Sequence, residues 1–422
     1  MDVISLDARA REILRGNDRG GYTVPTAGLY PYQWNWDSMF AAWGFATFDL
    51  DRAWAEVETL FAGQWANGMV PHILFHRPDP GYFPGPEVWG TDALAPIPSS
   101  GISQPPVAAS FVRRMWEQDR ARPEAAQLYD KLVDWHRWFM TWRCKDGAIF
   151  VTHPWESGRD NAPDWDTAMA AIDPVGVGPY TRRDTAHVDA SMRPTKNDYD
   201  RYIWLVERGR RLGWDEAAMA DTAPFRVACP GLTFITLGAS HDLLDLGQAL
   251  GRDTSEIADW IETLSAGAAT LWNPELSAYD ARDLGSNRLT GTLSNASYLA
   301  WFGGLGMDGL LGNLADRLAS LPYPVPSLDP SDPRFDSMRY WRGPTWGMMN
   351  ALIAIGLSKA GHGDVAETLR RATAQLIAEH GFAEYFDPYI GTPAGGGTFT
   401  WTAAIWLAWA SPSAKGGNHG ID

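Results

Sequence analysis

The stretch 123–142, PEAAQLYDKLVDWHRWFMTW, indicates the architecture of this 422-residue chain. Its large apolar residues recur every three or four positions, which is the spacing of one helical face: Leu128, Leu132, Trp135, Phe139 and Trp142. Pro123 opens the stretch, and proline is favoured in the first turn of a helix. Because such a helix is apolar on one face only, we expect it to pack that face against other helices.

The same periodicity recurs along the chain, and many of the helices that it predicts come in pairs joined by short turns. They are expected near residues 4–15, 37–48, 50–66, 105–120, 123–143, 197–213, 232–250, 254–272, 295–303, 307–320, 344–360, 362–380 and 400–410. We therefore predict an all-α fold, an (α/α)6 barrel of inner and outer helices, forming a single catalytic domain over residues 1–422. A helical solenoid is the alternative, but it would show a repeat of fixed length, and we find none.

Long loops rich in Gly, Pro, Asp and Trp separate the helix pairs. Since functional residues concentrate on loops held by a rigid scaffold, we expect residues 67–104 and 144–196 to cap one face of the barrel. Strand signals are weak and local, as at residues 148–152.

Composition excludes several classes of partner. The chain has 35 Lys and Arg against 51 Asp and Glu, a net charge of −16, which repels phosphate backbones and anionic membranes. No apolar run is long enough for a signal peptide or a membrane span, so we expect a cytoplasmic protein without nucleic-acid or membrane partners. A homo-oligomer is compatible with the sequence.

Metal, cofactor and nucleophile motifs are missing from the sequence. There is no Gly-x-Ser-x-Gly elbow, and neither Cys144 nor Cys229 lies in a motif. His72 and His76 have no acidic neighbours in sequence, so packing or hydrogen bonding is favoured over a metal role. The glycines 395–397 are expected to form a flexible loop rather than a phosphate cradle. We predict no metal and no cofactor.

Carboxylates among aromatic residues are the strongest chemical signal in a chain with 22 Trp. They concentrate in residues 153–166 (HPWESGRDNAPDWD) and 382–388 (FAEYFDP). Apolar surroundings raise a carboxyl pKa, so one acid can stay protonated while another stays ionised, and glycosidic cleavage needs such a pair. The alternative is that these loop acids cap helices and bind backbone amides.

The segment Trp155-Glu-Ser-Gly-Arg-Asp160 resembles the Glu-Ser-Gly-Trp-Asp general-acid motif of glycoside hydrolase family 63, inverting α-glycosidases on the (α/α)6 barrel. Further blocks resemble the family in chain order: residues 30–38, 64–72, 103–106, 340–346, 384–388 and 399–404. The short chain is most similar to the compact bacterial glucosylglycerate and mannosylglycerate hydrolases, as is its block Met192-Arg-Pro-Thr195 followed by Tyr199. Arg159 departs from the Trp frequent at that position in the wider family.

The resemblance implies that Asp160 is the general acid and Glu384 the general base. Glu156 and Asp164 remain alternatives for the acid, and Asp387 for the base; each could instead brace its loop.

Further residues are implied to bind substrate. Asp37 would accept hydrogen bonds from the sugar hydroxyls, unless it is the N-cap of helix 37–48. Arg193 would bind a carboxylate on the aglycone, with Arg342 as second candidate; the alternative for Arg193 is a salt bridge to Asp189 or Asp198. The remaining implied substrate ligands are Tyr30, Trp34, Trp36, Tyr82, Gln104, Trp155, Tyr199, Tyr340, Trp341 and Trp346.

The function implied by the resemblance is inverting hydrolysis of a small α-glycoside, glucosylglycerate or mannosylglycerate, to a hexose and glycerate. One alternative is an α-glucosidase acting on a neutral disaccharide or oligosaccharide of the kojibiose, nigerose or trehalose type. Another is a non-hydrolytic sugar-binding protein or an epimerase on the same barrel. In each case the expected partner is a small sugar.

Overall fold

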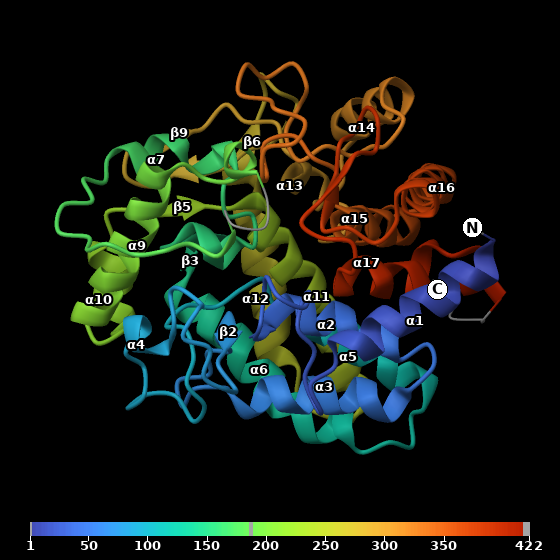
Figure 1. Ribbon diagram of the computed structural model, residues 1–422, viewed down its shortest axis with the longest axis horizontal. Coiled ribbons are helices and arrows are strands. Elements are labelled where there is room, and N and C mark those ends of the chain that lie inside the picture. Colours follow the sequence, from blue (N-terminus) through green and yellow to red (C-terminus); the bar gives the residue numbers. More distant parts are fainter. Residues whose placement is uncertain (1, 185–188, 417–422) are drawn as a thin grey trace.

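The computed structural model describes residues 2–184 and 189–416, so residues 185–188 of the second predicted cap loop lie outside it. Helices make up most of the fold (Figure 1). Their bounds are α1 (Val3–Asn17), α2 (Asn35–Phe45), α3 (Leu50–Ala62), α4 (Pro86–Trp89), α5 (Ala108–Gln118), α6 (Glu124–Trp142), α7 (Asp166–Ala170), α9 (Lys196–Arg211), α10 (Glu216–Thr222), α11 (Pro230–Ala249), α12 (Ser255–Gly267), α13 (Asn295–Tyr298), α14 (Asp308–Ser320), α15 (Gly347–Lys359), α16 (Gly363–His380) and α17 (Thr400–Ile405).

Some helices are buried on all sides, and others on one side only. Every residue of α2 is buried, as is α15 from Gly347 to Leu357. Their neighbours α3 and α16 each bury one face and expose the other. A helix that is apolar all round belongs in the interior, so α2 and α15 are inner helices, packed against the outer helices α3 and α16.

Glycines allow the inner helices to approach closely. A Cβ at Gly44 of α2 would lie 2.6 Å from Cβ of Ala404 in α17. A Cβ at Gly356 of α15 would lie 2.2 Å from the backbone nitrogen of Phe302, which follows α13. Any larger residue at these two positions would push the helices apart.

The strands are short, and they correct the all-α prediction to a mostly helical fold. One antiparallel sheet has the order β3-β4-β5-β8-β9, with Phe150 opposite Ala228, and three further pairs are β1-β2, β6-β7 and β10-β11. Their bounds are β1 (Gln33–Trp34), β2 (Ile73–Leu74), β3 (Cys144–Lys145), β4 (Ala148–Val151), β5 (Val227–Ala228), β6 (Trp272–Asn273), β7 (Ala278–Tyr279), β8 (Arg282–Asp283), β9 (Arg288–Leu289), β10 (Tyr385–Phe386) and β11 (Pro393–Ala394). β4 coincides with the weak strand signal in the sequence and is fully buried.

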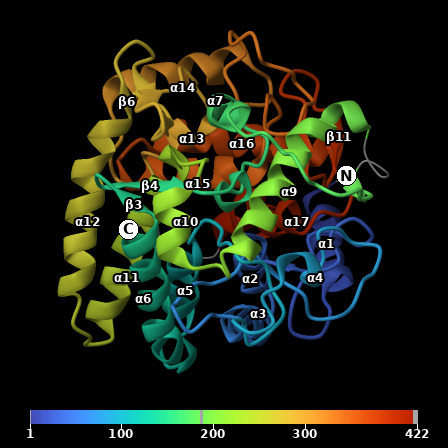
Figure 2. The same ribbon diagram turned by 90° about the vertical axis from the view of Figure 1, so that its left-hand side faces the viewer.

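The helices α4 and α7 of the two predicted cap segments lie on one side of the helical body, beside α9 and α10, whereas β4 of the second segment is buried. Figures 1 and 2 place α4, α7, α9 and α10 together on that side, in front of the inner helices in Figure 2. One continuous hydrophobic cluster includes residues from Leu6 to Ala410, and it contains residues of these four helices as well. No helix in the described part of the chain is long and apolar enough to cross a membrane.

Candidate active site

One pocket gathers most of the residues predicted to bind substrate or to catalyse. Its walls come from the segment before α2, from both predicted cap loops, from α9 and from the segments around Tyr340 and Glu384. Among its lining residues are the predicted Tyr30, Trp34, Trp36, Asp37, Tyr82, Gln104, Trp155, Asp160, Arg193, Tyr199, Tyr340 and Glu384. Aromatic rings and a few carboxylates therefore share one cavity, as a sugar site requires.

Asp160 follows a tight turn that only glycine allows. Gly158 has φ +67°, and a Cβ there would lie 2.5 Å from the ring of Trp36. Asp160 itself is partly exposed to the pocket. Desolvation by the surrounding side chains, and then the charge of Glu384, raise the pKa of Asp160 to about 7. A carboxyl with this pKa can carry a proton near neutral pH and release it during a reaction.

Glu384 is buried and held by three donors. Its side chain is 1% exposed, and it accepts hydrogen bonds from the hydroxyls of Tyr340 (2.9 Å) and Tyr30 (3.3 Å) and from the Arg193 guanidinium (3.2 Å). Burial raises the pKa of Glu384, while Arg193 and the tyrosines counteract that rise. Three donors aimed at one carboxylate fix its orientation and favour its charged form.

Gly395 makes room for Glu384. A Cβ at this position would lie 2.1 Å from Oε2 of Glu384, and its φ is +80°, where glycine is favoured. Glu384 N–H also donates to the Ala394 carbonyl at 3.0 Å, beside the β10-β11 pair. The flexible-loop interpretation of the glycines 395–397 was thus incomplete, because the first of them shapes the site.

Asp37 lies in the first turn of α2, inside the helix. The helix begins at Asn35 with Trp34 as its N-cap, so the alternative role of Asp37 as N-cap is wrong. Burial, and then the charge of Glu384, raise the pKa of Asp37 well above its usual range. A neutral carboxyl can both donate and accept hydrogen bonds, which suits the hydroxyls of a sugar.

The alternative catalytic carboxylates are engaged elsewhere. Glu156 accepts from Arg143 at 3.0 Å, Asp164 pairs with Arg159 at 3.0 Å, and Asp387 accepts from the N–H of Tyr389 at 2.7 Å. These three acids are outside the lining of the pocket. They brace their loops.

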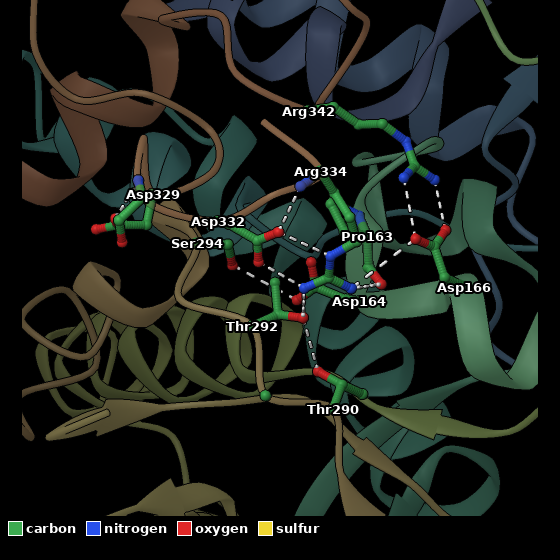
Figure 3. A network of polar contacts seen from close by, with 12 residues as sticks. Pro163, Asp164, Asp166, Thr290, Thr292, Ser294, Asp329, Asp332, Arg334 and Arg342 are labelled. Atoms are coloured by element: carbon green, nitrogen blue, oxygen red, sulfur yellow. Dashed lines mark hydrogen bonds and ion pairs between the residues drawn. The ribbon is translucent and has the colours of Figure 1, made fainter. Parts of the chain in front are cut away.

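Three arginines named in the sequence analysis, Arg193, Arg342 and Arg159, each form an ion pair in the structure. Arg193 pairs with Glu384, not with Asp189 or Asp198. Arg342 donates with both terminal nitrogens to Asp166 and so is not free for a substrate (Figure 3). Arg159 is buried and pairs with Asp164.

Trp341 and Trp346 are a correction to the predicted substrate ligands, because the pocket lining does not include them. Their rings stack on each other with centroids 3.8 Å apart and planes 3° apart. Trp346 lies against Tyr340 (5.2 Å) and Trp341 against Trp36 (6.5 Å). They form a second layer that supports the rings of the wall.

Sequence reasoning missed several lining residues, among them His72, Tyr202 and Trp401 and the charged Arg183 and Asp184. His72 stacks on Trp155 with centroids 6.0 Å apart, and burial lowers its pKa well below the usual range, which favours the neutral ring. Tyr202 lies one helical turn after Tyr199 on α9, a spacing that puts both on one face. His72 and Trp401 each lie in a block that resembles the family.

In the part of the chain that the structure describes, no group of three or more His, Cys, Asp or Glu side chains could hold a metal ion. Asp160, Glu384 and Asp37 all line the pocket, and the pKa values of their carboxyls are all raised. Such a cluster of perturbed carboxyls in one pocket is typical of an active site.

Comparison with known proteins agrees with this chemistry. The family model described as the mannosylglycerate hydrolase MGH1-like glycoside hydrolase domain matches residues 30–402. The chain belongs to this family. It is therefore a glycoside hydrolase, and the resemblance to family 63 is confirmed.

Relatives from plants and bacteria cover nearly the whole glycoside hydrolase chain. Mannosylglycerate hydrolase MGH1 of Selaginella moellendorffii is 43% identical over 97% of this chain and 86% of its own length. Glucosylglycerate hydrolase of Mycolicibacterium hassiacum is 34% identical over 96% of this chain and 97% of its own length. The crystal structure of the family 63 mannosylglycerate hydrolase from Thermus thermophilus with Tris and D-glycerate matches with a TM-score of 0.92 and 41% identity, over 96% of this chain and 99% of that one.

Proposed function

We propose that this enzyme hydrolyses the α-glycosidic bond of mannosylglycerate or glucosylglycerate, with inversion, to a hexose and glycerate. The observation that carries the proposal is the pair of carboxyls in one pocket, Asp160 free to donate a proton and Glu384 held by three donors. The relatives named for these two substrates, and the D-glycerate in one of their crystal structures, support the choice of substrate.

In the proposed reaction, Asp160 protonates the glycosidic oxygen as the bond to the anomeric carbon breaks. Glu384 takes a proton from a water that attacks the opposite face of the sugar ring, so the configuration inverts. Asp37 binds the hydroxyls of the sugar from the first turn of α2. The reaction uses no metal or cofactor in this scheme.

Arg193 is the proposed partner of the glycerate carboxylate. Its guanidinium is buried in the pocket, and its Nε has no hydrogen-bond partner among the described residues. Arg193 offsets the charge of Glu384, so a substrate anion meets less repulsion there. Because Arg193 also contacts the base, its removal would impair the turnover of neutral substrates too.

The pH dependence of kcat/KM follows from the two pKa shifts. Asp160 must be protonated, and its pKa is about 7, so activity falls as the pH rises through about 7. Glu384 must be ionised, and its pKa is raised, so activity also falls on the acid side, beginning at a higher pH than for an exposed glutamate. A pH profile of kcat/KM tests this: activity that stays constant up to about pH 9 would contradict the assignment of Asp160.

A substrate panel tests the proposed function. Mannosylglycerate, glucosylglycerate, trehalose, kojibiose and nigerose are incubated with the enzyme, and the released hexose and glycerate are quantified. We expect kcat/KM for one of the two glycerate glycosides to exceed that for every neutral disaccharide. Turnover of the neutral disaccharides alone would overturn the proposed substrate while leaving a glycosidase.

The proposed architecture is an (α/α)6 barrel in a single domain, with the two cap loops over its mouth. It is supported by the packing of α2 against α5 and α17, of α11 against α5 and α13, and of α15 against α17. Outer partners of these inner helices include α3, α6, α12, α14, α16 and α1. The cytoplasmic location and the oligomeric state stay predictions from the sequence.

A further inference from the structure

The proposed acid and base differ in how their carboxyls are held. Glu384 accepts hydrogen bonds from three side chains. The carboxyl of Asp160 accepts none from any other residue in the described part of the chain, although a general acid must stand within hydrogen-bond reach of the atom that it protonates. The position of Asp160 therefore depends on what holds its backbone.

Side-chain hydrogen bonds hold the backbone on both sides of Asp160. The Trp165 indole N–H donates to the carbonyl oxygen of Arg159 at 2.8 Å. The Tyr202 hydroxyl donates to the carbonyl oxygen of Asp160 at 2.9 Å. The Asn161 side-chain amide donates to the carbonyl oxygen of Tyr340 at 3.1 Å. Tyr202 lines the pocket, whereas Asn161 is 2% exposed and lies outside the lining. Asn161 thus acts on Asp160 without a place at the substrate.

Tyr340 is a fixed point for this contact. Its N–H donates to the Met192 carbonyl at 2.8 Å, and its hydroxyl donates to Glu384 at 2.9 Å. Its ring lies under the Arg193 guanidinium, 4.3 Å away, and against Trp346 at 5.2 Å. Through Tyr340, Asn161 connects the backbone beside the acid to a residue that holds the base.

The rest of the acid loop is anchored separately. Arg334 donates to the Pro163 carbonyl at 3.3 Å, and Arg342 binds Asp166 (Figure 3). Asp164 pairs with the buried Arg159. These contacts keep residues 163–166 in place without Asn161, so loss of Asn161 would loosen the residues next to the acid and leave the loop as a whole folded.

We propose that Asn161 is a positioning residue, which sets the place of Asp160 relative to Glu384 through its hydrogen bond to the Tyr340 carbonyl. The inference rests on the proposed function and adds a residue to it. A shift of about 1 Å in a reacting group costs on the order of 10²-fold in rate. The effect should fall on proton donation, because the base keeps its own three donors.

Asn161→Ala tests the inference with two substrates of the same hexose. For the glycerate glycoside, whose alkoxide leaves only when protonated, kcat should fall roughly 10- to 100-fold, with KM changed less than about 3-fold. For the α-glycosyl fluoride, whose leaving group needs far less protonation, kcat should fall less than about 3-fold. Asn313→Ala is the matched control, because the Asn313 amide also donates to backbone carbonyls, those of Leu276 and Ser277, away from the pocket. The Asn313→Ala variant should leave kcat unchanged on both substrates.

Thermal unfolding and hexose binding, both monitored by tryptophan fluorescence, show whether Asn161→Ala is folded. If Asn161→Ala is not, Asn161→Ser is measured instead, since serine keeps a polar group but cannot reach the Tyr340 carbonyl. Equal losses on both substrates, or no loss on either, would overturn the inference. Failure of the proposed function looks different: the wild-type enzyme would cleave neither glycerate glycoside, and the comparison would then use whichever alkyl α-glycoside it cleaves.

Discussion

Asp160→Asn is expected to lower kcat on the glycerate glycoside by at least about 10²–10⁴-fold. Asparagine keeps the size of the side chain, but its amide is far too weakly acidic to protonate the glycosidic oxygen. The carboxyl of Asp160 accepts no hydrogen bond from another described residue, so the substitution should leave the fold intact. Steady-state kinetics, thermal unfolding and fluorescence titration with the hexose separate lost chemistry from lost structure.

The leaving group distinguishes loss of the acid from general damage. Asp160→Asn should retain much more activity on the α-glycosyl fluoride than on the glycerate glycoside, because fluoride leaves with little protonation. Asp184→Asn is the comparison variant, since it makes the same chemical change at another aspartate that lines the pocket. Asp184→Asn should lower kcat on the glycerate glycoside far less than Asp160→Asn does. Near-normal turnover by Asp160→Asn would show that another group is the acid.

Glu384→Gln is expected to lower kcat by at least about 10²–10⁴-fold on the glycerate glycoside and on the fluoride alike. Water must lose a proton in both reactions, so the base is needed whatever the leaving group. Glutamine would also point an NH2 group toward donors from Tyr30, Tyr340 and Arg193, which removes the attraction that fixes the side chain. Kinetics on both substrates measure the loss, and hexose binding by fluorescence confirms an intact pocket.

Azide offers a positive test of the base. Glu384→Ala removes the side chain and leaves space for a small nucleophile that needs no deprotonation. With the α-glycosyl fluoride and azide, this variant should form the β-glycosyl azide, because the attack comes from the face opposite the leaving group. An α-glycosyl azide, or normal hydrolysis by either Glu384 variant, would contradict the role of Glu384.

Much of this site could be predicted from the sequence, because its candidate catalytic residues lie in short motifs. Asp160 and Glu384 each lie in a motif, and the structure brings both into one pocket. Trp341 and Trp346 show what the sequence could not predict. A tryptophan in the pocket wall and one behind it look the same in sequence, and only the structure shows that these two rings stack on each other outside the pocket lining. Asn161 was out of reach for a similar reason, since its partner Tyr340 is 179 positions away.

The fold shows the same division. Long periodic segments such as the one after Pro123 were predicted correctly as helices, and α6 spans Glu124–Trp142. Apart from β4, the strands were missed, because two-residue strands carry no periodicity and some pair across a long separation, as β5 does with β8, where Ala228 lies opposite Arg282. Helix 295–303 was predicted too long: α13 ends at Tyr298, and the chain then turns toward α14.

The most direct test of the account is the configuration of the sugar at the moment of release. Proton NMR of the anomeric signal, recorded during rapid hydrolysis of the α-glycoside, should show the β-anomer of the hexose first, with the α-anomer growing in later by mutarotation. That result requires a water between acid and base, with carboxyls about 6.5–9.5 Å apart. Early accumulation of the α-anomer would mean a covalent intermediate and double displacement, and would contradict the roles of Asp160 and Glu384.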